Sequence, residues 1–331
     1  MKALVTGGGG FLGSAIVRKL HERGDEVYVL GRGDYPQVVP FVKRFFQTDI
    51  RDGAAVAQAC GGMDVVFHTA ALAGIWGKRS DFRSINVGGT RNTIEACRAN
   101  GVHRLVYTSS PSVVFGGNDL CGVSESTPYP SNHLAAYPET KAAAEQMVLA
   151  ANSSTLATVA LRPHLIFGPG DPHLIPRVID RARRGRLVQV GDGKNLVDVT
   201  YIDNAATAHI QAADALTPES HCAGHAYFIS QGEPVMLWPW LNDLLDRVGA
   251  PKVTRSISFR RAYSAGAFFE LGYRAFGVVR EPPMTRFLAT QLAKSHYFDL
   301  SSARRGFGYE PIVSTADGVR RLVATLGKKI E

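Results

Sequence analysis

The chain has 331 residues, of which 45% are hydrophobic and 20% charged, the composition of an ordinary soluble globular protein that is long enough for two lobes. Its four cysteines are scattered and form no Cys-x-x-Cys pair, which argues against a metal site or a disulfide framework and favours a reducing cytoplasm. The net charge of +8 comes with no helix-turn-helix or aromatic-interleaved pattern, so we expect no nucleic-acid partner. We interpret the surplus arginines as a solvated surface, or as an attraction for an acidic substrate, carrier or lipid headgroup.

The first 22 residues predict a strand, a glycine-rich turn and a helix. Residues 2–6 form a short apolar run, and residues 11–22 have helical periodicity. Gly7, Gly10 and Gly13 lie in the turn between them. Glycines in this context let the backbone approach a pyrophosphate, which also meets the free N–H groups at the start of the helix. The turn therefore predicts a dinucleotide site. No signal peptide precedes the first strand, and we expect a cytoplasmic protein.

The second predicted strand, residues 26–30, ends at Gly31-Arg32-Gly33. Chains that bind NAD often carry Asp or Glu at this point, where the adenosine ribose lies. A guanidinium instead suits a 2′-phosphate, which it grips with two hydrogen bonds. Arg32 therefore predicts NADP(H) as the cofactor, and NAD(H) is the alternative. The interpretation without a role in binding is that Arg32 is a solvated side chain of the loop.

The next segments alternate between strand-like and helix-like runs. Residues 64–68, 104–108 and 158–162 are strand-like, and helical patterns run over 87–99 and about 137–151. This alternation predicts an α/β fold: a Rossmann, doubly wound parallel sheet with helices on both faces. Cys60 and Cys97 fall in helical patterns as small core residues. Ligands of such sheets bind at the carboxyl ends of the strands.

The pattern loosens from Gly168 onward. We assign residues 1–167 to an NADP-binding Rossmann domain, with segments returning to the sheet at about 197–216 (a strand, then a helix) and 226–230. Residues 168–196 and 217–331 then form a smaller, discontinuous substrate-binding lobe.

The aromatic segment 260–279 has two interpretations. It is too polar to span a membrane, and its apolar positions 265, 268, 269, 272 and 276 recur at helical spacing. A core or lid helix over the substrate is one interpretation. The other is a surface that lies on a membrane or contacts a pathway enzyme.

A candidate catalytic group follows from the spacing of Tyr137 and Lys141, which are four residues apart and share one helical face. A nearby ammonium lowers the pKa of a phenol, so we expect Lys141 to lower the pKa of Tyr137, which would protonate a carbonyl oxygen as hydride arrives. Ser110, after the strand at 104–108, would donate a hydrogen bond to the same oxygen, with Ser109 as the competing choice. A nucleophilic serine is the rival interpretation, but no Gly-x-Ser-x-Gly elbow surrounds it.

With this loop, this serine and Tyr137-x-x-x-Lys141, the chain resembles the extended short-chain dehydrogenase/reductases, and within them the 3β-hydroxysteroid dehydrogenase/isomerase branch. The resemblance implies a small-molecule substrate and a homodimer. It also implies contacts with the cofactor from Gly7, Gly10, Phe11, Leu12, Arg32, Asp49, Ile50, Thr69, Ala70, Ala71, Tyr137, Lys141 and Pro163.

A narrower similarity, to bacterial 2-alkyl-3-oxoalkanoate reductases of long-chain olefin biosynthesis, rests on segments 32–36, 71–77, 107–113 and 306–309. It implies NADPH-dependent reduction of the 3-oxo group of a long-chain acid, a reaction of lipid metabolism. The alternative is an NAD(P)-dependent 3β-hydroxysteroid or sterol dehydrogenase. A UDP-sugar epimerase and a non-catalytic NADP sensor agree less well with the sequence. Residues 114–136 differ most from the pattern of these reductases. This loop runs into the expected active site, so the difference affects which substrate is expected.

Overall fold

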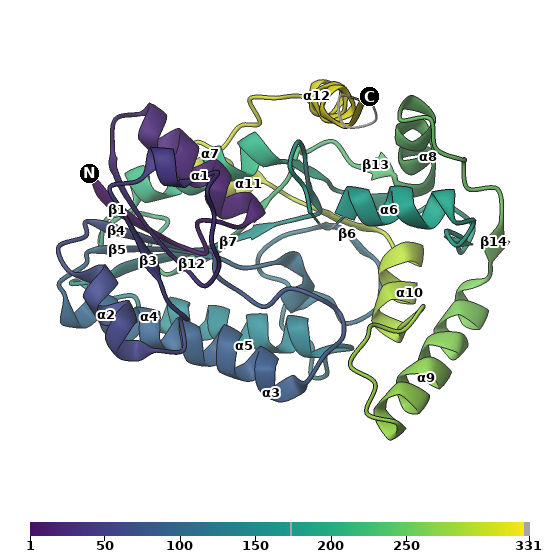
Figure 1. Ribbon diagram of the computed structural model, residues 1–331, viewed down its shortest axis with the longest axis horizontal. Helices are drawn as coiled ribbons and strands as arrows, with labels where there is room; N and C mark the ends of the chain where they lie inside the picture. The colour runs from purple at the N-terminus through teal and green to yellow at the C-terminus, as the bar shows by residue number, and fades with distance from the viewer. Residues whose placement is uncertain (173, 328–331) are drawn as a thin grey trace.

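The computed structural model describes residues 1–172 and 174–327 (Figure 1). At its centre lies a seven-stranded sheet in the order β12-β7-β5-β4-β1-β2-β3, with every neighbouring pair parallel. The order runs outward in both directions from β1 and β4, which makes their carboxyl ends the crevice where ligands of such sheets bind. The strands are β1 (Lys2–Thr6), β2 (Glu26–Gly31), β3 (Arg44–Gln47), β4 (Val65–His68), β5 (Arg104–Thr108), β7 (Ala157–Pro163) and β12 (His225–Ile229).

Helices cover both faces of this sheet, as Figure 1 shows. On one face lie α1 (Phe11–Glu22) and α7 (Ile202–Ala215), and on the other α2 (Gly53–Cys60), α4 (Gly89–Ala99) and α5 (Ala136–Ala150). The inner strands are therefore buried on both sides, and every residue of β7 is buried. The predicted doubly wound fold is confirmed. Cys60 and Cys97 are fully buried between α2 and α4 and are free thiols, as their positions in helical patterns predicted.

The second lobe contains a four-stranded sheet in the order β13-β10-β15-β6. Its strands are β13 (Val235–Met236), β10 (Leu196–Val197), β15 (His296–Phe298) and β6 (Leu120–Val123). Its helices are α6 (Leu174–Arg183), α8 (Leu237–Arg247), α9 (Phe259–Ala275) and α10 (Arg286–Ala293). The remaining elements are α3 (Arg79–Phe82), a π-helical turn (Arg83–Gly88), β8 (Ile166–Phe167), β9 (Gln189–Val190), β11 (Thr200–Tyr201), β14 (Ser256–Ile257), α11 (Ser301–Phe307), α12 (Thr315–Gly327) and 3-10 turns at Val39–Phe41 and Pro111–Val114.

The chain returns to the central sheet differently from the prediction. β12 does join the sheet, beside β7. The expected strand near residue 198 does not, because β11 pairs with β8 in a separate two-stranded sheet. Only the helix of that segment returns: α7 packs against α1, and His209 Nε2 lies 2.8 Å from Thr108 Oγ1 at the end of β5. β6, from the first half of the chain, lies in the sheet of the second lobe.

The aromatic segment forms α9, but the predicted apolar face is not its buried face. Ala262, Gly266 and Glu270 are buried, whereas Phe268 and Phe276 are exposed. The reason lies in α10, which packs along α9 and receives the Glu270 carboxylate at its own first turn, where the carboxylate accepts bonds from Arg286. This ion pair between buried Glu270 and half-buried Arg286 thus lies on the inward side of α9.

Candidate active site

The glycine-rich loop joins β1 to α1 in the predicted manner. Gly7 has φ of 69°, and its carbonyl accepts a hydrogen bond from Gly10 N at 2.9 Å. A side chain at Gly13 would place its Cβ 2.2 Å from Gly7 O, so only glycine allows α1 to approach the loop this closely. Such a turn leaves backbone N–H groups at the start of α1 free to meet an anion.

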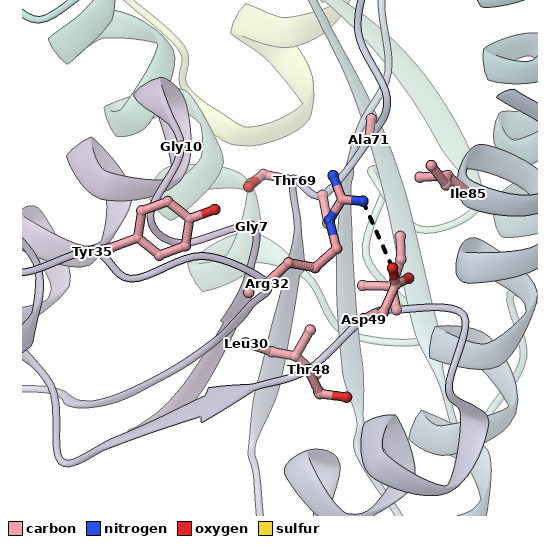
Figure 2. A pocket seen from close by; sticks show the side chains of 13 residues that line it. Gly7, Gly10, Leu30, Arg32, Tyr35, Thr48, Asp49, Thr69, Ala71 and Ile85 are labelled. Carbon is pink, nitrogen blue, oxygen red and sulfur yellow. Dashed lines mark ion pairs between the residues drawn. The ribbon is translucent and has the colours of Figure 1, made fainter. Parts of the chain in front are cut away.

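A cavity of about 180 Å³ lies beside this loop at the carboxyl ends of the strands (Figure 2). Eight residues of the predicted cofactor site line it: Gly7, Gly10, Arg32, Asp49, Ile50, Thr69, Ala70 and Ala71. Phe11, Leu12 and Pro163 do not, since the first two open α1 and pack on the core while Pro163 ends β7. The cavity and its glycine rim suit the adenosine and pyrophosphate of a dinucleotide.

Two guanidinium groups approach one carboxylate, Asp49, at this cavity. Arg32 extends across it, with its Nη1 3.7 Å from Asp49 Oδ2 (Figure 2). Arg51, which the sequence analysis missed, binds both oxygens of Asp49, at 3.0 Å from Nε and 2.8 Å from Nη2. The hydrogen bonds from Arg51 hold the pKa of Asp49 below its ordinary value, with a smaller effect of Arg32. Arg32 lines the cavity, whereas Arg51 holds Asp49 from outside its lining.

Tyr35 is a further lining residue that the sequence analysis did not assign to the site. Its ring lies against the glycine-rich loop so closely that a Cβ on Gly9 would come within 2.1 Å of Cγ. Figure 2 shows its hydroxyl pointing into the cavity. The run of four consecutive glycines could have indicated this contact: Gly9 is not one of the three positions of the fingerprint, and the ring of Tyr35 leaves no room there for a side chain.

The segment after β4 is held by buried polar side chains. His68 Nδ1 lies 2.7 Å from Thr6 Oγ1, and its Nε2 lies 3.0 Å from Thr90 Oγ1. Burial lowers the pKa of His68 to about 3, so the ring is neutral and serves as a hydrogen-bonding spacer. Asn86 accepts from Leu72 N at 2.7 Å and donates to Thr140 Oγ1 at 3.1 Å, which ties this segment to α5.

The candidate acid, Tyr137, lies in the first turn of α5 and is half-buried. Burial raises the pKa of Tyr137, and a hydrogen bond with the Ser110 side chain opposes that rise. We expected Lys141 to lower this pKa. In this structure the shift comes from burial and from Ser110, and Lys141 takes no part in it. Of the two candidate serines, Ser110 is the one that contacts Tyr137, whereas Ser109 Oγ is buried without a partner among the described residues.

Lys141 lies one turn further along α5 and is 2% exposed. Its Nζ donates to the carbonyl oxygen of Thr108 at 2.5 Å and lies 4.1 Å from the centre of the Tyr107 ring. Burial lowers the pKa of Lys141 to about 7, and the carboxylate of Glu145 opposes that shift. The Lys141 side chain is thus fixed at the end of β5 by Thr108 and Tyr107.

Glu145 continues the same face of α5 and is the main functional neighbour that the sequence analysis missed. Its two carboxylate oxygens accept from Arg162 at 2.9 and 2.6 Å, and one also accepts from Tyr129 at 2.6 Å. Glu145 and Arg162 are both almost wholly buried. Glu145 could have been found from the sequence, because residues 137, 141 and 145 are spaced four apart and therefore share one face of the helix. This ion pair anchors α5 to β7 beneath the candidate catalytic side chains.

A larger cavity, of about 560 Å³, lies where the two lobes meet. Ala135 and Ala136 line it, so it reaches the residue before Tyr137. Its apolar wall consists of Ile75, Trp76, Phe82, Leu134 and Phe287, and its cations are Arg79, Arg274 and Arg286. Arg79 pairs with Glu139 and Arg286 with Glu270, whereas Arg274 lies over the Trp76 ring at 5.7 Å. Within the described chain no carboxylate pairs with Arg274.

The fold and the site together indicate the class of protein to which this chain belongs. Residues 4–260 match the 3-beta hydroxysteroid dehydrogenase/isomerase family, and the chain belongs to that family. It is an NAD(P)-dependent oxidoreductase.

Particular relatives narrow the comparison. The chain is 52% identical over 328 residues to "2-alkyl-3-oxoalkanoate reductase" of Stenotrophomonas maltophilia (strain K279a). The alignment covers 98% of this chain and 99% of that one. It is 35% identical to the mouse (Mus musculus) "sterol-4-alpha-carboxylate 3-dehydrogenase, decarboxylating", over 97% of this chain and 90% of that one. Among solved structures it is similar to MoeE5 in complex with UDP-glucose and NAD, with a TM-score of 0.77, 25% identity and complete coverage of both chains.

Proposed function

We propose that this protein reduces the 3-oxo group of a 2-alkyl-3-oxoalkanoic acid to the 3-hydroxy acid, with NADPH as reductant and Tyr137 as proton donor. The observation that carries the proposal is the 52% identity to a 2-alkyl-3-oxoalkanoate reductase along nearly the whole of both chains. The site agrees with this chemistry, because Tyr137, Ser110 and Lys141 converge at the carboxyl end of β5.

The cofactor would lie on residues that fit it: the glycine-rich loop for the pyrophosphate and Arg32 with Asp49 for the adenosine ribose. When bound, NADPH supplies the hydride. The chain supplies the rest. Tyr137, whose pKa burial keeps high, remains protonated at neutral pH and gives its proton to the carbonyl oxygen. Ser110 donates a hydrogen bond to the same oxygen as negative charge develops there. Lys141, fixed by Thr108 O, would hold the hydroxyls of the nicotinamide ribose.

The cavity between the lobes suits an amphiphilic acid. Its apolar wall accommodates alkyl chains, and a carboxylate needs a cation that is free to receive it. Arg79 and Arg286 already carry carboxylates. We therefore assign the substrate carboxylate to Arg274.

The cofactor preference yields a prediction for Arg32. Arg32→Ala should raise the dissociation constant of NADPH about 10- to 100-fold, since a charge-assisted contact with the 2′-phosphate contributes about 1.5–3 kcal/mol. The affinity for NADH, which lacks that phosphate, should change less than about twofold. Fluorescence titration of both cofactors measures this. Arg51→Ala is the matched control, because Arg51 binds Asp49 from beside the same cavity. An equal loss for NADPH and NADH in Arg32→Ala would contradict the assignment.

The substrate is tested in the oxidative direction, because a 2-alkyl-3-oxoalkanoic acid decarboxylates readily. We expect growth of NADPH absorbance with NADP⁺ and a 2-alkyl-3-hydroxyalkanoic acid, and little with NAD⁺. A 3β-hydroxysteroid is the competing substrate, because the mouse relative is a sterol dehydrogenase. Turnover of the steroid alone would overturn the substrate and retain the site.

A further inference from the structure

Helix α9 exposes apolar side chains that the proposed chemistry does not use. Phe268 is 75% exposed and Leu271 is 71% exposed, and beyond the helix end Phe276 is 86% and Val279 67% exposed. Residues 260, 264, 268, 271 and 275 recur at helical spacing and are all exposed, so Phe268 and Leu271 share one outward stripe with Arg260. We call Phe268, Leu271, Phe276 and Val279, together with Arg260, Arg261 and Arg280, the α9 surface. Figure 1 shows α9 at the outer edge of the second lobe, with α10 along its inner side.

The charge around this surface is mainly positive, and Glu281, which follows Arg280, pairs with Arg177. Residues 252–280 contain six basic side chains and a single acidic one, Glu270, which is buried against Arg286. Arg260, Arg261 and Arg280 are exposed, and no ion pair within residues 1–172 and 174–327 joins them to a carboxylate. An apolar stripe with unpaired cations on its borders is complementary to an anionic lipid surface: the side chains enter the acyl boundary and the guanidinium groups meet phosphates.

The α9 surface also adjoins the cavity between the lobes. Trp76, which lines that cavity, donates from Nε1 to Val278 O at 3.1 Å and packs edge-on against Tyr273, with ring centres 6.1 Å apart. A smaller hollow of about 190 Å³, which includes Val279 in its lining, shares Trp76 and Arg274 with the larger cavity. The turn after α9 therefore lies between the exposed apolar side chains and the lining of the cavity between the lobes.

We propose that the α9 surface docks the protein on an anionic phospholipid bilayer, so that amphiphilic substrate passes between the bilayer and the cavity at Trp76. The contact is interfacial, and no helix of the described chain is long and apolar enough to cross a membrane. The passage of substrate rests on the proposed function, whereas the bilayer contact does not.

Vesicle flotation tests the contact without cofactor or substrate. The wild-type protein should float with vesicles of phosphatidylcholine and phosphatidylglycerol, and at least about tenfold less with phosphatidylcholine alone. Phe268→Ser with Leu271→Ser should weaken binding to the anionic vesicles at least about tenfold, because both side chains lose their apolar burial in the bilayer. Arg260→Glu with Arg261→Glu should weaken it by a similar factor. Ile312→Ser is the matched control, since Ile312 is 62% exposed and lies outside the α9 surface.

Three results would overturn the proposal. The wild-type protein could stay at the bottom of the gradient with both kinds of vesicle, or the Phe268→Ser/Leu271→Ser variant could bind as well as the wild type. The third result is a dimer in solution that this double substitution dissociates and that does not bind vesicles. Activity on a short, water-soluble 3-hydroxy acid should be unchanged in both double variants. That assay separates the two proposals, because an inactive wild-type protein that still floats would remove the substrate and retain the docking surface.

Discussion

Tyr137→Phe should lower kcat/KM about 10²- to 10⁴-fold in either direction of the reaction, the range that a positioned general acid contributes. The substitution removes one hydroxyl, whose side-chain partner is Ser110. The aromatic ring, the start of α5 and the Lys141 contact with Thr108 remain. Affinity for NADPH should stay within about threefold, and stability within about 1.5 kcal/mol, the usual net effect of one hydrogen bond. Stopped-flow absorbance with saturating cofactor measures the hydride step itself.

The matched control for Tyr137→Phe is Tyr28→Phe, which removes a hydroxyl that bonds Glu26 at 3.3 Å on β2. It should leave kcat/KM within about twofold. A loss of less than about threefold in Tyr137→Phe would mean that another group protonates the carbonyl oxygen. Ser110→Ala then becomes the informative variant, since Ser110 is the side chain that hydrogen-bonds Tyr137.

The sequence predicted those parts of the site that depend on local spacing. The glycine-rich turn, the strand ends and the helical face shared by Tyr137 and Lys141 each follow from residues within one or two turns of each other, where backbone geometry alone decides the outcome. The carboxyl ends of parallel strands then bring the distant segments to one edge. Arg32 was assigned to the cofactor site on this basis, whereas Asp49 and Thr69 were assigned from the family resemblance, and all three line one cavity.

Long-range polar contacts could not be predicted in this way. Glu145 reaches Arg162 on β7, and Glu270 reaches the first turn of α10; neither partner is visible from the periodicity of its own helix. The second case reversed the predicted inward face of α9, because apolar spacing alone gives no weight to a buried carboxylate. β11 was misplaced for a related reason. Its two residues, Thr200 and Tyr201, are of β-branched and aromatic types that favour strands, but these preferences do not say which strand they pair with, and β11 pairs with β8 instead of the central sheet.

The buried ion pair below the site yields the largest expected change in stability. Glu145→Ala should lower the free energy of unfolding by about 3–5 kcal/mol, because it leaves the Arg162 guanidinium buried without its counter-charge. Arg162 Nη1 already lacks a hydrogen-bond partner in the described chain, so no spare acceptor compensates. Urea denaturation followed by circular dichroism measures the change.

Glu145→Ala also removes the carboxylate that raises the pKa of Lys141. The pKa of Lys141 should therefore be lower in this variant, and its residual activity should fall at a lower pH than that of the wild type as Lys141 loses its proton.

Glu139→Ala is the control, because Glu139 lies on the same helix and its ion pair with Arg79 is exposed, which limits the expected cost to about 1 kcal/mol. The cause of the loss in Glu145→Ala can also be isolated. If the cost is the uncompensated charge and not the lost packing, Glu145→Met combined with Arg162→Met should recover most of it, since apolar groups of similar volume replace buried ion pairs at little cost. A double variant as unstable as Glu145→Ala would show instead that the shape of the Tyr129–Glu145–Arg162 network, rather than its charge balance, holds α5 against β7.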